Sequence, residues 1–353
     1  MDKRDALLQP PTTLAAALAM HPFEPSVWLR NPHYQTIAAA LWPRDFSWSR
    51  LESERRLFLL PDGSRIAVDC SWQPDRTRSP TLIVVHGLEG SSNSPYMLGV
   101  THKAYHYGFN VARLNLRNCG GTEHQTETLY HAGQSDDVRL VVKTLIQQDG
   151  LDQIGIIGFS MGGNICLKLA GEWGTHAPKA VLGVVGVSPL VDLTTSWQLI
   201  ERLENTLYRW MFVWNLKQRI RRKAKLFPDR YDVSRLRGLR TIRHFDERYQ
   251  APCSGFADAD DYYRRASALP FLPAIRIPTL ILHAEDDPIL PVTPFRHPEV
   301  QNNPYILTLI VDQGGHVGFI ARNRKEDLDC YWAENRAVEF FRLLLGGIKQ
   351  NNP

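Results

Sequence analysis

The chain has 353 residues, 43% of them hydrophobic, which is enough for one large α/β domain with an insertion or for two small domains. Its formal charge of +4 comes from 41 basic and 37 acidic residues, and so mild a balance gives no argument for nucleic-acid binding. The five cysteines are scattered without C-x-x-C spacing, which favours a reduced, cytoplasmic setting and indicates neither a disulfide framework nor a zinc site.

No apolar run in the sequence approaches the length of a membrane span. The apolar stretch 14–20 is short and follows Pro10 and Pro11, which argues against a secretory signal peptide. We therefore expect a soluble protein.

The predicted elements begin with an N-terminal arm, residues 1–50, which is rich in Pro and Trp and is expected to be extended or helical. Two apolar runs follow, at 57–60 and 66–70, and they flank the turn sequence 61–64. This pattern predicts an antiparallel hairpin at the edge of a sheet.

Strand-like and helix-like stretches then alternate along the chain. The predicted strands lie at 81–86, 110–116, 154–159, 180–187, 279–283 and 305–311, and the predicted helices lie at 96–107, at 136–148, after 160 and near 332–345. Alternation of this kind implies a parallel sheet with helices on both faces, and the nearly continuous apolar strands fit burial on both sides. We expect an α/β fold with a mostly parallel, eight-stranded sheet and a core formed by 51–188 and 274–353.

The alternation stops between residues 189 and 273. This segment is helical in character and rich in Trp, Arg and Tyr. Because it follows the sixth predicted strand, it would lie above the carboxyl ends of the parallel strands, and we expect it to form a helical lid.

The hexapeptide 158–163, Gly-Phe-Ser-Met-Gly-Gly, carries the most information about function. It follows a predicted strand and opens a predicted helix, which is the context of a G-x-S-x-G nucleophile elbow with Ser160 at its apex. Gly158 and Gly162 lack the Cβ atoms that would clash across so tight a turn, and Gly163 lets the helix lie close to the strand.

A nucleophilic serine needs a base to accept its proton and a carboxylate to orient that base. In this setting the chain order is Ser, then Asp or Glu, then His. The sequence supplies Asp286 and Asp287 after the seventh predicted strand, and His316 after the eighth. We favour Asp287, which is followed four residues later by a proline, and expect Asp286 to cap the turn or face solvent. The alternative is that both are turn carboxylates and that His316 is a surface-loop histidine.

An oxyanion hole would use two backbone N–H groups. One belongs to Met161, the residue after the serine. The other lies in the loop 86–92, His-Gly-Leu-Glu-Gly-Ser-Ser, where the Leu88 N–H is the better candidate. The spacing of glycines in this loop matches neither dinucleotide-binding nor P-loop patterns, which argues against a phosphate site.

With these residues the chain resembles the α/β-hydrolase superfamily and, more narrowly, its YheT-like branch (AB hydrolase family 4). The likeness runs over nearly the whole chain and includes motifs at 31–36, 86–90, 117–121, 130–133, 158–163, 255–258, 261–263, 283–288 and 314–319. The resemblance implies serine-dependent hydrolysis of carboxylic esters, with the triad at Ser160, Asp287 and His316 and no metal or organic cofactor. Eukaryotic relatives often carry an N-terminal membrane anchor, which we do not expect here.

We expect the substrate to be a small-molecule ester, with an acyl or lipid-like ester favoured over a peptide. Two other functions stay open: acyl transfer on the same triad, and a non-catalytic hydrolase scaffold that binds lipid or another ligand. Dehalogenase and epoxide-hydrolase chemistry is disfavoured, because those relatives carry Asp at the position of Ser160.

Three further features have two interpretations each. The segment 210–225 joins aromatic residues to a basic run, so it is either a lid helix with a solvated cationic face or a peripheral membrane contact; no nucleic acid is expected. His131 and Asp136 match an H-x-x-x-x-D pattern linked to acyl transfer, yet 135–137 equally suits a helix N-terminus. Cys119 lies near the pocket or is a buried, inert thiol.

Overall fold

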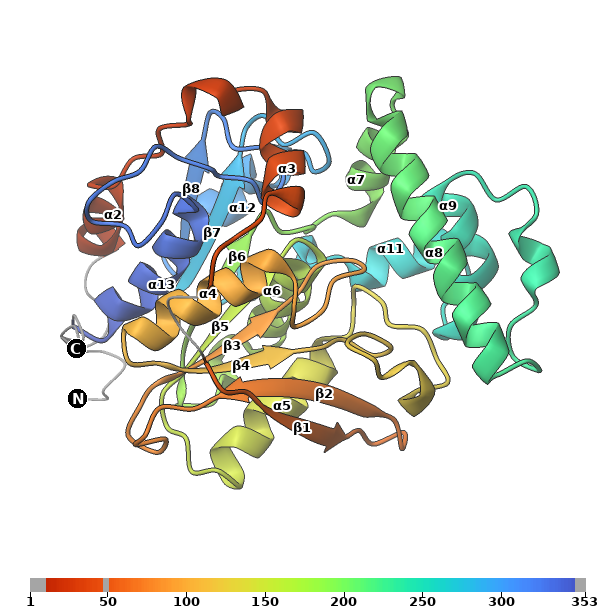
Figure 1. Cartoon of the computed structure of the whole chain (residues 1–353), viewed down its shortest axis with the longest axis horizontal. Helices are drawn as coiled ribbons and strands as arrows, with labels where there is room; N and C mark the ends of the chain where they lie inside the picture. Colours follow the sequence, from red (N-terminus) through yellow and green to blue (C-terminus); the bar gives the residue numbers. More distant parts are fainter. Residues whose placement is uncertain (1–10, 47–50, 347–353) are drawn as a thin grey trace.

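The computed structural model describes residues 11–46 and 51–346, which fold around one eight-stranded sheet (Figure 1). The strand order across the sheet is β1-β2-β4-β3-β5-β6-β7-β8. The strands are β1 Glu54–Leu59, β2 Arg65–Ser71, β3 Thr81–Val85, β4 Asn110–Leu114, β5 Ile154–Phe159, β6 Val181–Val187, β7 Thr279–Ala284 and β8 Ile306–Val311. The predicted α/β class is therefore confirmed.

Strand direction follows the prediction as well. The β1–β2 hairpin forms one edge, and β2 runs antiparallel to both of its neighbours, β1 and β4. All other pairings are parallel. Strand β3 lies between β4 and β5, so that Val85 pairs with Leu114 on one side and with Gly158 on the other. The chain order thus reverses at β3, and in open α/β sheets the crevice at such a switch point is where ligands bind.

Helices cover both faces of the sheet (Figure 1). They are α2 Pro11–Ala19, α3 Pro32–Leu41, α4 Pro95–His106, α5 Ser135–Gln147, α6 Met161–Trp173, α7 Leu193–Ile200, α8 Thr206–Leu226, α9 Ile242–Phe245, α10 Ala251–Cys253, α11 Ala259–Ala266, α12 Pro298–Gln301 and α13 Trp332–Leu344. Alternate residues of β3 enter different cores: Ile83 packs with α5 and α6, whereas Val84 packs with α4 and α13. Burial on both faces explains why the strands are apolar throughout.

The segment between β6 and β7 contains α7 to α11 and a π-helical turn, Asp246–Gln250. Helix α8 is its longest element, and the buried side of this helix forms a small core of its own with residues of the turn and nearby loops. In Figure 1 the segment projects from one end of the sheet. The division of the chain at 51, 189 and 274 into arm, core and lid stays a prediction.

In its described part the N-terminal arm contains α2, a short 3₁₀ turn and α3, joined by non-helical segments. Helix α3 begins at a cap in which Asn31 accepts hydrogen bonds from the N–H groups of His33 and Tyr34. Residues 1–10 and 47–50 of the predicted arm lie outside the described residues. Among the helices of 11–46 and 51–346, none combines the length and the apolar character needed to cross a membrane.

Candidate active site

Ser160 lies between the end of β5 and the start of α6, on backbone that is unusual for a residue with a side chain. Its φ of +53° and ψ of −117° fall in a sparsely populated region, which costs on the order of 1–3 kcal/mol. A Cβ at Gly158 would overlap the backbone of Gly162, and one at Gly162 would overlap the carbonyl groups of Val85 and His86. The two glycines therefore permit the strained turn that lifts the serine above the sheet.

Three side chains from loops far apart in the sequence meet at this turn. The His316 Nε2 lies 3.0 Å from Ser160 Oγ, and the His316 Nδ1 lies 2.8 Å from Asp287 Oδ2. The other carboxylate oxygen of Asp287 accepts hydrogen bonds from the N–H groups of Ile289 and Leu290, at 2.8 and 2.9 Å. Burial alone would raise the pKa of Asp287, but the charge and hydrogen bond of His316 outweigh it and lower the pKa. This geometry allows Ser160 to pass a proton to an imidazole that a carboxylate orients.

Asp286 has a different position. Its Oδ1 accepts a hydrogen bond from the Gly315 N–H at 2.9 Å, and partial burial raises its pKa. The carboxyl group thus ties the β7 loop to the loop that carries His316. Of the two candidate aspartates, it is Asp287 whose side chain contacts the imidazole.

Helix α3 of the N-terminal arm packs against the loop that carries His316. The His316 N–H donates to Thr36 Oγ1 at 2.9 Å, and a Cβ at Gly315 would lie 2.5 Å from the Pro32 carbonyl oxygen. Gln35, which is fully buried, exchanges two hydrogen bonds with the backbone of Ile320. The role of these arm residues was not predicted from the sequence, although the 31–36 motif is among those that carry the family likeness.

The loop after β3 lies directly against the elbow. A Cβ at Gly87 would lie 3.1 Å from Ser160 Cβ, so the backbone approaches the serine closely. Among the described residues, neither the Leu88 N–H nor the Met161 N–H donates a hydrogen bond to another protein group. Within this part of the chain both donors are therefore without a protein acceptor, as an oxyanion hole requires.

Buried His86 fixes this loop to β4. Its Nε2 accepts a hydrogen bond from the Leu116 N–H at 3.1 Å, so the proton belongs on Nδ1, which donates to the Gly87 carbonyl at 2.7 Å. Burial lowers the pKa of His86 to about 4, which keeps the ring neutral. Tyr96 adds a further support, because its hydroxyl accepts the Gly87 N–H at 3.0 Å.

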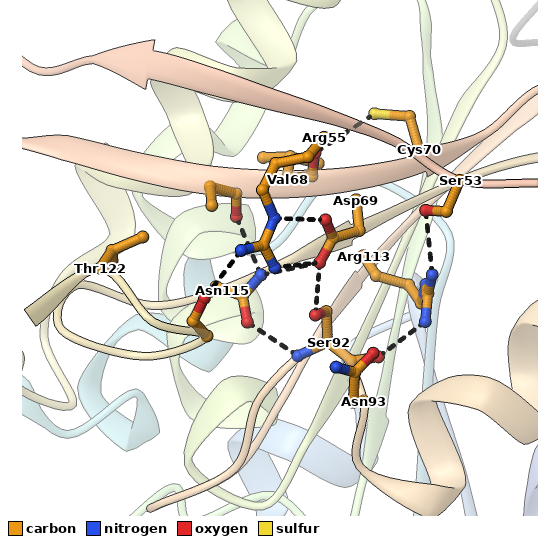
Figure 2. A network of polar contacts seen from close by, with 12 residues as sticks. Ser53, Arg55, Val68, Asp69, Cys70, Ser92, Asn93, Arg113, Asn115 and Thr122 are labelled. Atoms are coloured by element: carbon orange, nitrogen blue, oxygen red, sulfur yellow. Dashed lines mark hydrogen bonds and ion pairs between the residues drawn. The ribbon is translucent and has the colours of Figure 1, made fainter.

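A polar network ties the loop after β3, at Ser92, to β2 (Figure 2). Asp69 accepts a hydrogen bond from Ser92 Oγ at 2.5 Å, a weaker one from Asn115 Nδ2 at 3.3 Å, and two from the Arg55 guanidinium at 2.8 and 3.0 Å. Burial would raise the pKa of Asp69, but the hydrogen bonds from Arg55 and Ser92 lower it on balance. The ionised carboxylate thus ties the loop after β3, through Ser92, and the end of β4, through Asn115, to β2.

An apolar cavity of about 90 Å³ begins beside Leu88 and Met161 and runs under the helical segment. Its wall includes Leu193, Trp197 and Phe245, and its lining also contains a few polar groups, among them Asp246. The cavity thus adjoins Met161, the residue that follows Ser160, and its lining is mainly apolar.

Two buried cations attach α8 to the loops of the site. The Arg219 guanidinium forms an ion pair with Glu89 and a hydrogen bond with the Tyr130 hydroxyl, and it lies over the Tyr130 ring. One turn further on, the ammonium group of Lys223 donates to Asn118 Oδ1 at 2.9 Å and to the Thr126 carbonyl. Both side chains are buried, so the basic run is partly structural, which neither interpretation from the sequence anticipated.

Two other sequence features have a structural role. Cys119 is buried, as predicted, and desolvation raises the pKa of its thiol to about 12, which agrees with an inert role. His131 accepts the Gly133 N–H and packs edge-on against Phe256, whereas Asp136 is exposed in the first turn of α5 and pairs with Arg139. The helix N-terminus is thus the interpretation of this segment that the structure favours.

Comparison with known proteins agrees with this architecture. Residues 80–322 match a family model described as the alpha/beta hydrolase fold. Among solved structures, an esterase from Pyrococcus furiosus, Pf2001, aligns with a TM-score of 0.55 at 16% identity, covering 87% of this chain and 97% of that one. The chain belongs to the α/β-hydrolase fold family.

Curated relatives place it more narrowly. The chain is 33% identical to "Putative esterase YheT" of Escherichia coli over 84% of its length and 87% of the relative's. It is 32% identical to the monoacylglycerol lipase of Saccharomyces cerevisiae, over 68% of this chain and 55% of that protein, and 26% identical to the mouse phospholipase ABHD3, over 84% and 73%. The chain is a member of the YheT-like branch, and the three relatives named here are called an esterase, a lipase and a phospholipase.

Proposed function

We propose that this protein is a serine-dependent carboxylic ester hydrolase with Ser160 as nucleophile, His316 as base and Asp287 as the orienting acid. The observation that carries the proposal is the unbroken chain of contacts from Ser160 Oγ through the imidazole to a buried, ionised carboxylate. The strained elbow and the free N–H groups of Leu88 and Met161 support it.

The reaction follows from this geometry. Ser160 Oγ attacks the acyl carbon while His316 Nε2 takes its proton, and Asp287 stabilises the imidazolium that forms. The N–H groups of Leu88 and Met161 receive the developing oxyanion, and each such donor contributes roughly 3 kcal/mol in the transition state. The imidazolium then protonates the leaving alcohol, and the acyl-enzyme remains. In the second half His316 takes a proton from water, the oxygen of that water attacks the acyl carbon, and the imidazolium returns the proton to Ser160 Oγ as the acyl–Oγ bond breaks and the acid leaves.

We infer that the acyl part of the substrate is apolar. The cavity beside Leu88 and Met161 is lined mainly by aliphatic and aromatic side chains, and helices between β6 and β7 cover it as a lid. The names of two relatives, a monoacylglycerol lipase and a phospholipase, point to the same class of ester.

An activity-based probe tests the nucleophile. A fluorophosphonate should label the wild-type protein at one site, and Ser160→Ala should abolish the labelling. Ser71→Ala is a matched control, since Ser71 is a buried serine at the end of β2 and, among the described residues, its hydroxyl has no hydrogen-bond partner. Equal labelling of wild type and Ser160→Ala would overturn the assignment.

A second measurement tests which acyl chains the enzyme prefers and whether water or an alcohol accepts the acyl group. Hydrolysis of a p-nitrophenyl ester series of increasing acyl length should reach a maximum at an acyl length set by the cavity, and Ser160→Ala should be inactive throughout. Adding glycerol tests for acyl transfer, because a transferase would convert the acyl group to glycerol esters at the expense of free acid. Inactivity of the wild type over the whole series would favour the non-catalytic scaffold.

A further inference from the structure

The first half of α8 exposes large apolar side chains on its outward face. Leu207, Trp210, Met211 and Trp214 are 62%, 65%, 41% and 50% exposed. Their spacing of three and four residues places them on one side of the helix. Single exposed apolar residues are ordinary, but a contiguous group with two tryptophans marks an interaction surface.

The second half of the same face is cationic. This outward face continues with Lys217, Arg221 and Lys225, and within the described residues none of the three forms an ion pair. Helix α8 contains no acidic residue between Thr206 and Leu226. The outward face of α8 is therefore aromatic at one end and positively charged at the other.

Helix α3 extends the apolar part of this surface. Tyr34, Ile37 and Leu41 are exposed at helical spacing, and α3 carries no charged residue. The two helices meet where the His33 ring stacks on the Tyr208 ring, with a 3.1 Å hydrogen bond between them. Figure 1 shows α3 and the first half of α8 at the upper edge of the molecule.

We propose that these faces of α8 and α3 dock on the surface of an anionic lipid membrane. Tryptophan and tyrosine rings favour the boundary between head groups and acyl chains, and an apolar face beside unpaired lysines and arginines is typical of helices that lie in that boundary. The cations add attraction to anionic head groups. The occupant is a membrane and not a second copy, because two copies of this face would bring Lys217, Arg221 and Lys225 of each chain together with no acidic residue of α8 to offset them. The exposed apolar residues Leu57 and Leu59 on β1 follow Arg55 and Arg56 and offer no acidic complement either.

Docking here would bring lipid to the two elements that touch the site. Helix α3 supports the His316 loop through Thr36, and α8 contacts the loop after β3 through Arg219 and Glu89. The proposal goes beyond ester hydrolysis and does not rest on it, because membrane binding needs only the outer surface of these helices.

Vesicle flotation tests the docking surface. Full-length protein is mixed with vesicles of phosphatidylcholine alone, or of phosphatidylcholine with roughly 30% phosphatidylglycerol. Wild type should float with the anionic vesicles, and Trp210→Ser with Trp214→Ser should weaken that binding at least about tenfold. Leu57→Ser with Leu59→Ser removes comparable exposed apolar residues from β1 and should bind as wild type does.

The charged half of the surface has its own test. Lys217→Gln with Arg221→Gln should remove most of the preference for anionic over neutral vesicles, whereas Arg65→Gln with Lys143→Gln, an equal loss of charge elsewhere, should keep it. Near-wild-type hydrolysis of a soluble ester and an unchanged circular dichroism spectrum would show that each variant folds. All binding is repeated on Ser160→Ala protein, so a failure of the proposed hydrolysis leaves the membrane result intact.

Two outcomes would overturn the proposal. Wild type that stays with the soluble fraction at every anionic lipid concentration has no such surface. A wild-type dimer that dissociates when Trp210 and Trp214 are replaced, without vesicle binding, would assign the face to contact between protein chains.

Discussion

Arg219 of α8 forms a buried ion pair with Glu89, the residue that follows Leu88 in the loop after β3. Glu89 has a φ of +58°, and its N–H donates to the Tyr130 hydroxyl at 2.8 Å, the same hydroxyl that Arg219 contacts. The helical segment between β6 and β7 thus holds the conformation of the loop whose Leu88 N–H we assign to the oxyanion.

Replacing Arg219 by Met should therefore lower both stability and turnover. Removal of Arg219 leaves the partly exposed Glu89 without its counter-charge, which costs on the order of 3 kcal/mol of unfolding free energy. If the loop relaxes and the Leu88 N–H moves, kcat should fall on the order of a hundredfold. Because Arg219 also lines the apolar cavity, KM should change as well. Both quantities are measured by urea denaturation and by ester hydrolysis.

Arg222 provides the matched control. It lies on the same helix, half exposed, and its guanidinium is 3.6 Å from Glu123. Arg222→Met should cost less than about 1 kcal/mol, as exposed pairs do. Combining Arg219→Met with Glu89→Gln should recover part of the lost stability but not the turnover. Equal effects of the Arg219 and Arg222 variants on kcat would contradict a positioning role for Arg219.

A second prediction concerns Thr36. Thr36→Val keeps the shape of the side chain but removes the acceptor of the His316 N–H. An unsatisfied N–H of this kind costs about 1–3 kcal/mol, and a loop that shifts to relieve it misplaces the imidazole. We expect kcat to fall roughly tenfold with KM nearly unchanged, since the cavity beside Leu88 is untouched. Thr36→Ser keeps the hydroxyl and should restore kcat; a variant that stays impaired would show that packing, not the hydrogen bond, matters.

These two contacts mark the limit of what the sequence could predict. The sheet and its helices follow from local patterns, because strands buried on both faces are continuously apolar and the helices between them are periodic. Ser160, Asp287 and His316 each follow a strand in a fixed order, so the candidate site was also accessible from the sequence.

The supports of that site have no local pattern. Thr36 and His316 are 280 positions apart, and nothing in the 31–36 motif says which loop it meets. Arg219 and Lys223 belong to a basic run whose composition is the same whether its members face solvent or the core. Only the packing of α8 distinguishes the two buried cations from the exposed Arg221.

The two neighbouring aspartates give a third prediction. Asp287→Asn leaves an amide where the carboxylate orients His316, so the imidazolium loses its stabilising charge and kcat should fall on the order of 10⁴-fold. Asp286→Asn keeps an oxygen that can accept the Gly315 N–H, and kcat should change less than about tenfold. Steady-state kinetics on one soluble ester compares the variants directly. A larger loss from Asp286→Asn would reverse our assignment of the acid.

The last prediction uses the buried carboxyl of Asp246, which lines the cavity. Burial raises its pKa to about 7, although the 2.7 Å hydrogen bond from Tyr263 acts in the opposite direction. A carboxyl whose pKa is higher in the folded chain binds its proton more tightly there. Its contribution to stability is therefore complete below the unfolded pKa of about 3.9 and is lost as the pH rises to about 7.

Asp246→Asn should remove this dependence of the unfolding free energy on pH. The unfolding free energy of the variant minus that of the wild type should become more positive between pH 5 and pH 7, by on the order of 2 kcal/mol, and should level off above pH 7. Asp260→Asn is the control. The Asp260 carboxylate is exposed and paired with Arg243, and the hydrogen bond from Arg243 lowers its pKa. Any effect of Asp260 on the pH dependence of the unfolding free energy therefore lies below pH 5. Urea titrations at pH 5, 6, 7 and 8 measure both variants. Parallel stability profiles for wild type and Asp246→Asn would mean that Asp246 is ionised throughout this range, and the wall of the cavity would then carry a charge at the pH of the reaction.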